Sequence, residues 1–262
     1  MATEQIVTSV EGAIGWLTFN NPGRHNAISM AMAEHLPAAV AAFEADARVR
    51  VVILTGAGEK AFAAGSDISG FGESRANPDA NRRYNALHET AYDAVYASAK
   101  PTIAMIRGYC IGGGLDFAAS CDVRIAAEDA SFSAPAGKLG LGYGYESVVR
   151  LKRVLGGPAA RELLISARRM NAQEAFRLGL VHRVVPVATL RDETVEYAEG
   201  LAANAPLTLA AIKRSLRELE RDEAVRDAAA AQKLIDACFA SADYEAGRAA
   251  FAAKRKPDFR GK

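Results

Sequence analysis

Short apolar runs alternate with segments of helical periodicity along most of the chain. Helical patterns cover residues 29–45, about 81–98 and 115–120, and a further series of helices begins at Tyr145. This alternation predicts an α/β fold with covered sheets. The candidate strands are residues 13–19, 49–54, 102–106, 123–126 and 181–185.

The pattern changes near Pro206, because the sequence that follows is helical and contains no strand candidate. We therefore expect a core of residues 1–200, followed by a separate helical region of residues 201–262. No low-complexity segment interrupts the chain, and no internal repeat is strong enough to assign from sequence.

The composition narrows the class of protein. The chain has 262 residues, 50% of them hydrophobic, and a formal net charge of +1. Its longest basic run is residues 254–256, so we expect no nucleic-acid partner. Three widely spaced cysteines suggest neither a disulfide framework nor a metal site, and fit a reducing cytoplasm. Because no signal pattern and no apolar run of roughly 20 residues is found, we expect neither export nor membrane insertion.

Two glycine-containing turns follow candidate strands. Residues 112–114 are three glycines directly before a helical segment, where free N–H groups and the helix dipole favour an electron-rich partner. The segment lacks the lysine and hydroxyl of a phosphate loop, so a nucleotide fold is disfavoured. Residues 64–67 form the second turn, although a glycine after a strand more often marks only a turn. Backbone N–H groups from two such turns, if they converge, stabilise negative charge on one oxygen.

Five segments along the chain form an ordered set of sequence blocks. They are NNPGRHNAIS (20–29), VVILTGAGEKAFAAGSDI (51–68), GYCIGGGLDFAASCDVRIA (108–126), ISARRMNAQEAFRLGLVHRVVP (165–186) and FAAKRKPDF (251–259). In this order they resemble the signature blocks of the crotonase, or enoyl-CoA hydratase/isomerase, superfamily. The resemblance implies a spiral of ββα units with a helical C-terminal trimerisation region, assembled as a homotrimer or a dimer of trimers. It also implies an acyl-CoA thioester substrate and no cofactor beyond its CoA moiety.

The same resemblance assigns binding positions. The backbone N–H groups of Ser66 and Gly113 would hold the thioester oxygen as it gains enolate charge. No metal is expected, because the four histidines lack the paired spacing of a metal site. Contacts to CoA are implied for Arg24, His25 and Ala64 of the same subunit, and for Phe251 and Lys254 of a neighbouring one.

Some of these CoA positions have a simpler interpretation. Arg24 and His25 are also explained as an exposed loop pair, and Lys254 as one solvated charge of a basic tail.

The acid and base positions depart from the hydratase pattern. Asp116 stands where the resemblance implies the first catalytic glutamate, although an acidic residue there also stabilises the helix dipole. Ala136 stands where the second glutamate is expected, and alanine transfers no proton. Tyr143 matches a substrate-facing tyrosine of decarboxylase-like members, although Tyr143 and Tyr145 are both also explained as packing aromatics. Glu146 is also explained by helix electrostatics.

Three functions remain open at this stage. The first is hydration of a 2-enoyl-CoA with Asp116 as the lone carboxylate and Tyr143 as its polar partner. The second is decarboxylation of a malonyl-type CoA thioester. The third is non-catalytic binding of acyl-CoA, or RNA binding, which the near-neutral charge disfavours. The acyl group would be selected by pocket walls from residues 71–96, where no specific motif is found.

Overall fold

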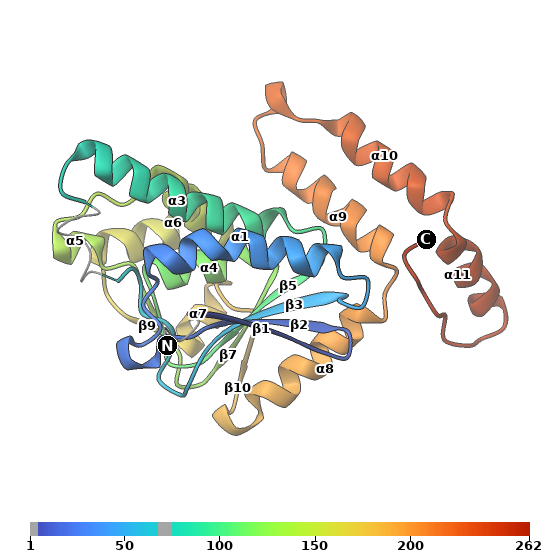
Figure 1. Cartoon of the computed structure of the whole chain (residues 1–262), viewed down its shortest axis with the longest axis horizontal. Helices are drawn as coiled ribbons and strands as arrows, with labels where there is room; N and C mark the ends of the chain where they lie inside the picture. Colours follow the sequence, from blue (N-terminus) through green and yellow to red (C-terminus); the bar gives the residue numbers. More distant parts are fainter. Residues whose placement is uncertain (1–4, 68–74) are drawn as a thin grey trace.

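A computed structural model describes residues 5–67 and 75–262 of the chain. These residues form two sheets. Helices α1 (Met30–Ala45), α3 (Pro78–Ala97) and α4 (Gly113–Ser120) lie on one side of the larger sheet, and helix α8 (Leu190–Ala202) lies on the other (Figure 1). The larger sheet has six strands in the order β1-β2-β3-β5-β7-β10, and the smaller has four in the order β4-β6-β8-β9. The predicted α/β fold with covered sheets is confirmed.

The strands of the larger sheet run parallel except for the antiparallel pair β1 and β2. Its members are β1 (Ile6–Glu11), β2 (Ile14–Phe19), β3 (Val51–Gly56), β5 (Thr102–Ile106), β7 (Val123–Ala127) and β10 (Arg183–Val185). The strands of the smaller sheet are β4 (Ala61–Ala63), β6 (Tyr109–Ile111), β8 (Ser131–Ser133) and β9 (Met170–Asn171).

One structural unit recurs along the chain. Strands β3, β5 and β7 of the larger sheet are each followed by a three-residue strand of the smaller sheet, which are β4, β6 and β8 respectively. Each pair then leads towards a helix, so the chain winds as the expected spiral of ββα units. The short strands β4, β6 and β8, and the edge strand β1, were not predicted. Three-residue strands carry too little alternation to be read from sequence.

The helices around and beyond the sheets have definite bounds. They are α1 (Met30–Ala45), α3 (Pro78–Ala97), α4 (Gly113–Ser120), α5 (Ala136–Leu139), α6 (Tyr145–Ser166), α7 (Ala172–Arg177), α8 (Leu190–Ala202), α9 (Pro206–Leu219), α10 (Ala228–Phe239) and α11 (Ala242–Ala252). Three 3-10 turns accompany them in the described residues: η1 (Pro22–Arg24), η3 (Val187–Thr189) and η4 (Glu223–Val225).

The central strands of the larger sheet, β3, β5 and β7, are buried on both faces, whereas the edge strand β1 is largely exposed. Along β3, Val51 and Ile53 pack towards α8, whereas Val52 and Leu54 pack into the main core beneath α1 and α4. Successive side chains of a strand point to opposite faces, so a strand covered on both sides is apolar throughout. This arrangement explains why β3 appears in the sequence as a continuous apolar run rather than an alternating one.

Two helix starts differ from the sequence prediction. Helix α3 begins at Pro78 rather than near residue 81, because the Asn77 side chain accepts a hydrogen bond from the Ala80 N–H at 2.9 Å and caps the helix there. Helix α4 begins at Gly113 rather than near residue 115, so Gly113 and Gly114 lie in the helix and Gly112 is its N-cap. The expected segment after Asp67, including Ile68 and Phe71, lies outside the described residues.

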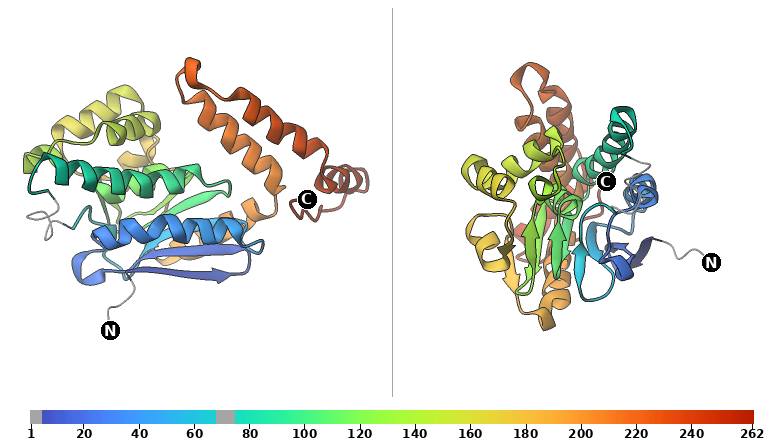
Figure 2. Two further views of the ribbon diagram at one scale, coloured as in Figure 1. Left: turned by 45° about the horizontal axis from the view of Figure 1, so that its top comes forward. Right: turned by 90° about the vertical axis from the view of Figure 1, so that its left-hand side faces the viewer.

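The C-terminal helices α9, α10 and α11 extend away from the sheets (Figure 2). They contain no strand, as predicted from Pro206 onward. Within the described ranges, no helix is both long and apolar enough to cross a bilayer. The three cysteines are free.

Candidate active site

The glycine triplet has a steric explanation at each position. Gly112 has φ +49° and ψ −118°, a conformation that side chains disfavour. A Cβ on Gly113 would lie 2.8 Å from the Tyr92 Oη, and one on Gly114 would lie 2.2 Å from the Ala63 carbonyl oxygen. The triplet therefore lets α4 begin in close contact with β4 and with α3.

This contact brings the two predicted turns together. The Ser66 amide nitrogen lies 3.8 Å from the Cβ position of Gly113, and Gly65, at φ +98°, supplies the bend before Ser66. Ser66 is held in place by a parallel bridge to Ile28. Within residues 5–67 and 75–262, neither the Ser66 N–H nor the Gly113 N–H donates to an acceptor. Two backbone donors are thus side by side and available for a ligand.

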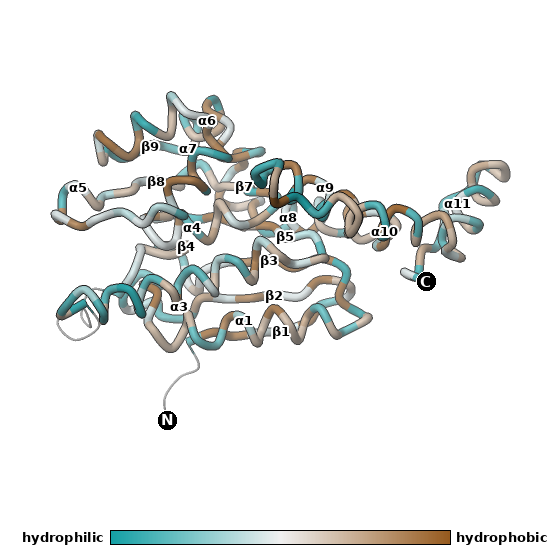
Figure 3. The backbone as a smooth tube through the Cα atoms, turned by 90° about the horizontal axis from the view of Figure 1, so that it is seen from above, coloured by the Kyte–Doolittle hydropathy of each residue, from teal (hydrophilic) through white to brown (hydrophobic). Residues whose placement is uncertain are grey.

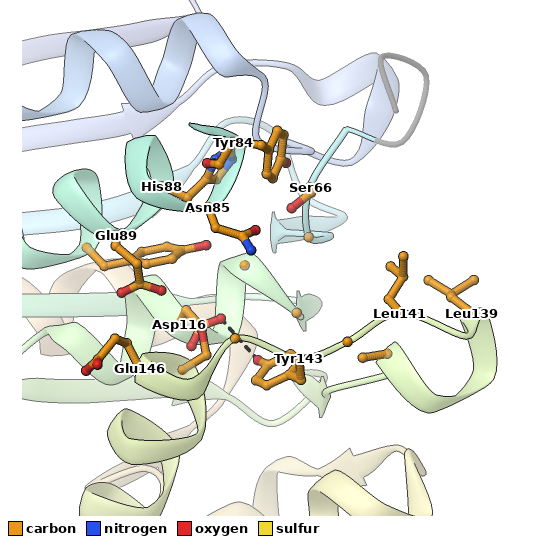
Figure 4. Close-up of a pocket in the computed structure, with 18 of the residues that line it drawn as sticks. Ser66, Tyr84, Asn85, His88, Glu89, Asp116, Leu139, Leu141, Tyr143 and Glu146 are labelled. Atoms are coloured by element: carbon orange, nitrogen blue, oxygen red, sulfur yellow. Dashed lines mark hydrogen bonds between the residues drawn. The ribbon is translucent and has the colours of Figure 1, made fainter. Parts of the chain in front are cut away.

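Both turns face a cavity of about 310 Å³. Its other walls come from the pocket-facing side of α3, from α5, and from the loop and first turn that open α6 (Figure 4). The side chains that line it and that matter below are Asn85, Glu89, Asp116, Ala136, Tyr143 and Glu146.

Asp116 lies in the first turn of α4, two residues after the triplet, with only 3% of its surface exposed. The Tyr143 hydroxyl donates to Asp116 Oδ2 at 3.0 Å, a contact drawn in Figure 4. Arg150 Nη1, from α6, donates to Asp116 Oδ1 at 3.3 Å. The two candidate side chains from the sequence analysis are therefore hydrogen-bonded to each other inside the cavity.

Burial raises the pKa of the Asp116 carboxyl to about 6, against the opposing effects of Arg150 and of hydrogen bonds from Tyr143 and Ser147. Such a carboxyl exchanges a proton close to neutral pH, which suits acid and base catalysis. Burial likewise raises the pKa of the Tyr143 phenol, and the Asp116 charge adds to the effect. Tyr143 therefore remains a hydrogen-bond donor.

Arg150 also contacts an acidic residue that the sequence analysis did not identify as part of the site. Its Nη2 donates to Glu89 Oε2 at 2.7 Å, and its guanidinium carbon lies 4.7 Å from the centre of the Tyr92 ring. The side chains of Arg150 and Asp116 are 6% and 4% exposed, whereas that of Glu89 is 24% exposed. Glu89 gives no local signal in the sequence, since its role depends on how α3 packs against α4 and α6.

The remaining candidates of the α5–α6 loop are arranged differently. Ala136 opens α5 and lines the cavity, where it provides no acid or base. Tyr145 is 78% exposed. Glu146 occupies the first turn of α6, and its carboxylate points away from Asp116 in Figure 4.

Three residues with predicted CoA contacts, Arg24, His25 and Ala64, lie together beside the turn of residues 64–67. The Ala64 N–H donates to the His25 carbonyl at 3.0 Å, and Ala64 lines the cavity. Arg24 donates to both carboxylate oxygens of Asp67, at 3.0 and 2.8 Å. The His25 ring packs edge-on against Tyr109 with centroids 5.7 Å apart.

Phe251 and Lys254 lie far from this group. They belong to and follow α11, at the opposite end of the molecule from α5 in Figures 1, 2 and 3. Phe251 is 88% exposed. Within one chain these residues do not reach the cavity, so the expected contact requires a second copy.

The buried histidine of the cavity wall has a structural explanation. His88 Nδ1 bonds to the Tyr84 carbonyl at 3.0 Å, and the two rings stack with centroids 4.1 Å apart. Burial lowers the pKa of His88 to about 4, so it is neutral. Among the residues that the structure describes, no group of three or more His, Cys, Asp or Glu side chains is placed to hold a metal ion.

The spiral of ββα units and this cavity define the class of protein: an enzyme fold in which two available backbone donors face a buried carboxylate. A sequence model of the enoyl-CoA hydratase/isomerase family matches residues 9–262. The short-chain-enoyl-CoA hydratase of Clostridium acetobutylicum is 32% identical over 98% of this chain and 97% of its own length. The carnitinyl-CoA dehydratase of Escherichia coli is 35% identical over 99% of this chain and 100% of its own.

The solved structures agree with the sequence relatives. An enoyl-CoA hydratase/carnithine racemase from Magnetospirillum magneticum superposes with a TM-score of 0.93 and 38% identity, over 100% of this chain and 97% of that chain. The chain therefore belongs to the enoyl-CoA hydratase/isomerase family and has the crotonase fold. Enzymes of this family act on acyl-CoA thioesters.

Proposed function

We propose that the protein hydrates a 2-enoyl-CoA, or dehydrates the corresponding 3-hydroxyacyl-CoA, with Asp116 as its acid and base. The observation that carries this proposal is the position of Asp116, buried in the cavity and hydrogen-bonded to Tyr143, beside the donors of Ser66 and Gly113. Relatives named as a hydratase and a dehydratase support it, because hydration and dehydration are the same type of reaction in opposite directions.

The thioester carbonyl would accept hydrogen bonds from the Ser66 and Gly113 N–H groups. Both groups are free of other acceptors in the described residues, and Gly113 is at the positive end of α4. As water adds to the β carbon, electrons move onto the carbonyl oxygen, and these donors stabilise the enolate. Loss of one such donor costs about 3 kcal/mol of barrier.

Asp116 would take a proton from water and return it to the α carbon. Its pKa of about 6 leaves it mostly ionised at neutral pH and still basic enough to be protonated during the reaction. Tyr143 remains protonated and holds Asp116 Oδ2 in place. Neither step needs a metal or a cofactor beyond the CoA moiety of the substrate.

CoA would extend from the cavity past Ala64 and His25, with Arg24 at the rim. Phe251 and Lys254 would come from a neighbouring copy, because α11 is remote from its own cavity. The C-terminal helices support such an assembly, since a second, largely apolar hollow of about 660 Å³ lies among α9, α10 and α11. We infer a homotrimer or a dimer of trimers, which sedimentation equilibrium would distinguish from a monomer.

Decarboxylation of a malonyl-type thioester is the second candidate, supported by Tyr143 at the cavity wall. The structure weakens this candidate in two respects. The single phenolic proton of Tyr143 is already donated to Asp116, and a departing carboxylate would face the Asp116 charge.

Mass spectrometry of acyl-CoA pools tests the proposal directly. Purified protein is incubated with 2-enoyl-CoA and substituted malonyl-CoA thioesters, in parallel with Asp116→Asn. Gain of one water that the substitution abolishes supports the hydratase. Loss of carbon dioxide would move the protein to decarboxylation, and binding without turnover would make it a non-catalytic acyl-CoA binder.

A further inference from the structure

The cavity has a carboxylate besides those of Asp116 and Glu146, on a different element from the position that Ala136 occupies. Glu89 projects from α3 towards the same space as Asp116, and Asn85, one helical turn earlier, points its carboxamide into the cavity (Figure 4). The wall opposite the α5–α6 loop is therefore polar at the level of Asp116.

The two carboxylate oxygens of Glu89 have different surroundings, because only one of them is hydrogen-bonded to Arg150. Oε2 accepts the 2.7 Å hydrogen bond from Arg150, which keeps the carboxylate in a fixed orientation. Oε1 accepts no hydrogen bond from the part of the chain that the structure describes. It lies 4.0 Å from the Cβ position of Gly144, at the edge of the cavity. A fixed carboxylate oxygen at a cavity wall is well suited to accept a hydrogen bond from water.

The charges around Arg150 do not cancel. The Arg150 guanidinium faces the carboxylates of Asp116 and Glu89 within the cavity, and that of the exposed Asp93 at 4.0 Å. The group therefore carries a net negative charge when these carboxylates are ionised. A buried ion pair needs only one carboxylate for each arginine, and burial of a further charge is costly. An excess charge at a cavity wall is typical of a functional site.

We propose that Glu89 is the water-positioning carboxylate of this site, which accepts a hydrogen bond through Oε1 from the water that Asp116 deprotonates. This inference rests on the proposed hydration. One O–H bond of the water breaks and its proton goes to Asp116, while the oxygen bonds to the β carbon of the substrate. The π electrons of the double bond move to form the enolate, and Asp116 then gives the proton to the α carbon. Glu89 exchanges no proton in this step and accepts a hydrogen bond from the second hydrogen of the water.

Other groups also face Asp116 and set its charge. Arg150 and Ser147 approach from α6, Tyr143 from the loop before it, Tyr92 and Glu89 from α3, and Cys110 from β6. Of these, the Glu89 charge raises the pKa of Asp116 and the Arg150 charge lowers it. Neutralising Glu89 therefore lowers the pKa of Asp116, which gives the proposal a second readout.

Glu89→Gln is the central test, because glutamine keeps the size of the side chain and an acceptor for Arg150. We expect kcat for hydration to fall roughly 10- to 100-fold, with KM changed less than about threefold, since water is misplaced but thioester contacts are intact. The acid limb of the kcat profile moves to lower pH. Adding Ala136→Glu restores at least about tenfold of the loss, because it returns a carboxylate to the same cavity.

Asp93→Asn is the matched control. Asp93 is one turn further along α3 and lies 4.0 Å from the same Arg150 nitrogen, but its side chain is 69% exposed. Its substitution leaves kcat and the pH profile unchanged.

The outcomes separate this inference from the proposed function. If the wild-type protein hydrates no enoyl-CoA, both fail. If the wild type is active and Glu89→Gln keeps kcat within about threefold, only the role of Glu89 fails. It also fails if the loss of kcat comes with an unmoved acid limb and no recovery with Ala136→Glu, which would mark Glu89 as structural support for Arg150.

Discussion

The two sides of the cavity are built in different ways. On one side, the donors are backbone N–H groups of Ser66 and Gly113, fixed by a bridge to Ile28 and by the contact of α4 with β4. On the other side, the working groups are the side chains of Asp116 and Tyr143, held by hydrogen bonds within the cavity. The position of the donors on the first side depends on the path of the main chain. The chemistry of the second side depends on which side chains the fold brings into the cavity.

This difference determines how each side tolerates change. A backbone donor survives many side-chain substitutions but is lost when the main chain shifts. A side-chain acid or base is lost by a single substitution that leaves the fold intact. Ala136, at the position where the resemblance implies a second glutamate, is an example of such a side-chain change.

The largest expected effect comes from Gly114→Ala, which would displace the main chain that carries the backbone donors. The new Cβ would lie 2.2 Å from the Ala63 carbonyl oxygen, so α4 must move away from β4. We expect a loss of about 3 kcal/mol in stability and roughly 1,000-fold in hydration rate. Thermal unfolding and steady-state kinetics measure both. Gly137→Ala is the control, since no atom lies within 4 Å of its Cβ position, and an unaffected Gly114→Ala would contradict the steric argument.

Asp116→Asn attacks the side-chain side and leaves the fold intact. We expect kcat for hydration to fall roughly 100- to 1,000-fold while KM is largely retained, because asparagine transfers no proton. Glu146 lines the same cavity, but its carboxylate is turned away from Asp116. Glu146→Gln is therefore the control and should keep full activity. Equal losses in both variants would indicate that the cavity, rather than Asp116, was damaged.

The backbone side could be predicted from sequence because its signals are local. Three consecutive glycines before a helix, and an Ala-Gly-Ser turn after a strand, each lie within a few residues of one another. The resemblance to a family then connected the two turns and pointed to Ser66 and Gly113. Their close approach, 3.8 Å between the Ser66 nitrogen and the Cβ position of Gly113, came only from the structure.

The side-chain side could be predicted only in part. Asp116 was found from its position after the triplet, and Tyr143 from the loop before α6, but their hydrogen bond spans 27 residues. Glu89 and Arg150 are 61 residues apart and carry no motif that connects them. Their pairing depends on the register of α3 against α6, which hydrophobic periodicity does not specify.

The pH dependence of the wild type tests the state of Asp116. The group must be ionised to take a proton from water, and burial raises its pKa to about 6. We therefore expect kcat to be nearly constant above pH 7 and to fall about tenfold for each unit well below pH 6. Fixed-time assays from pH 5 to 8, with protein stability checked at each pH, measure this dependence of kcat on pH. A flat profile down to pH 5 would mean that Asp116 is not the base.

The smallest expected effect is that of Tyr143→Phe, which removes a hydrogen bond to Asp116 but no reacting group. That bond favours the ionised carboxylate, so its loss, worth about 1 kcal/mol, raises the pKa of Asp116. The acid limb then moves to higher pH, and kcat falls about threefold at pH 6 but little at pH 8. Tyr145→Phe is the matched control, because that ring is 78% exposed. A loss of equal size at both pH values would instead give Tyr143 a direct part in the reaction. The side-chain side of the cavity would then contain two reacting groups, Asp116 and Tyr143.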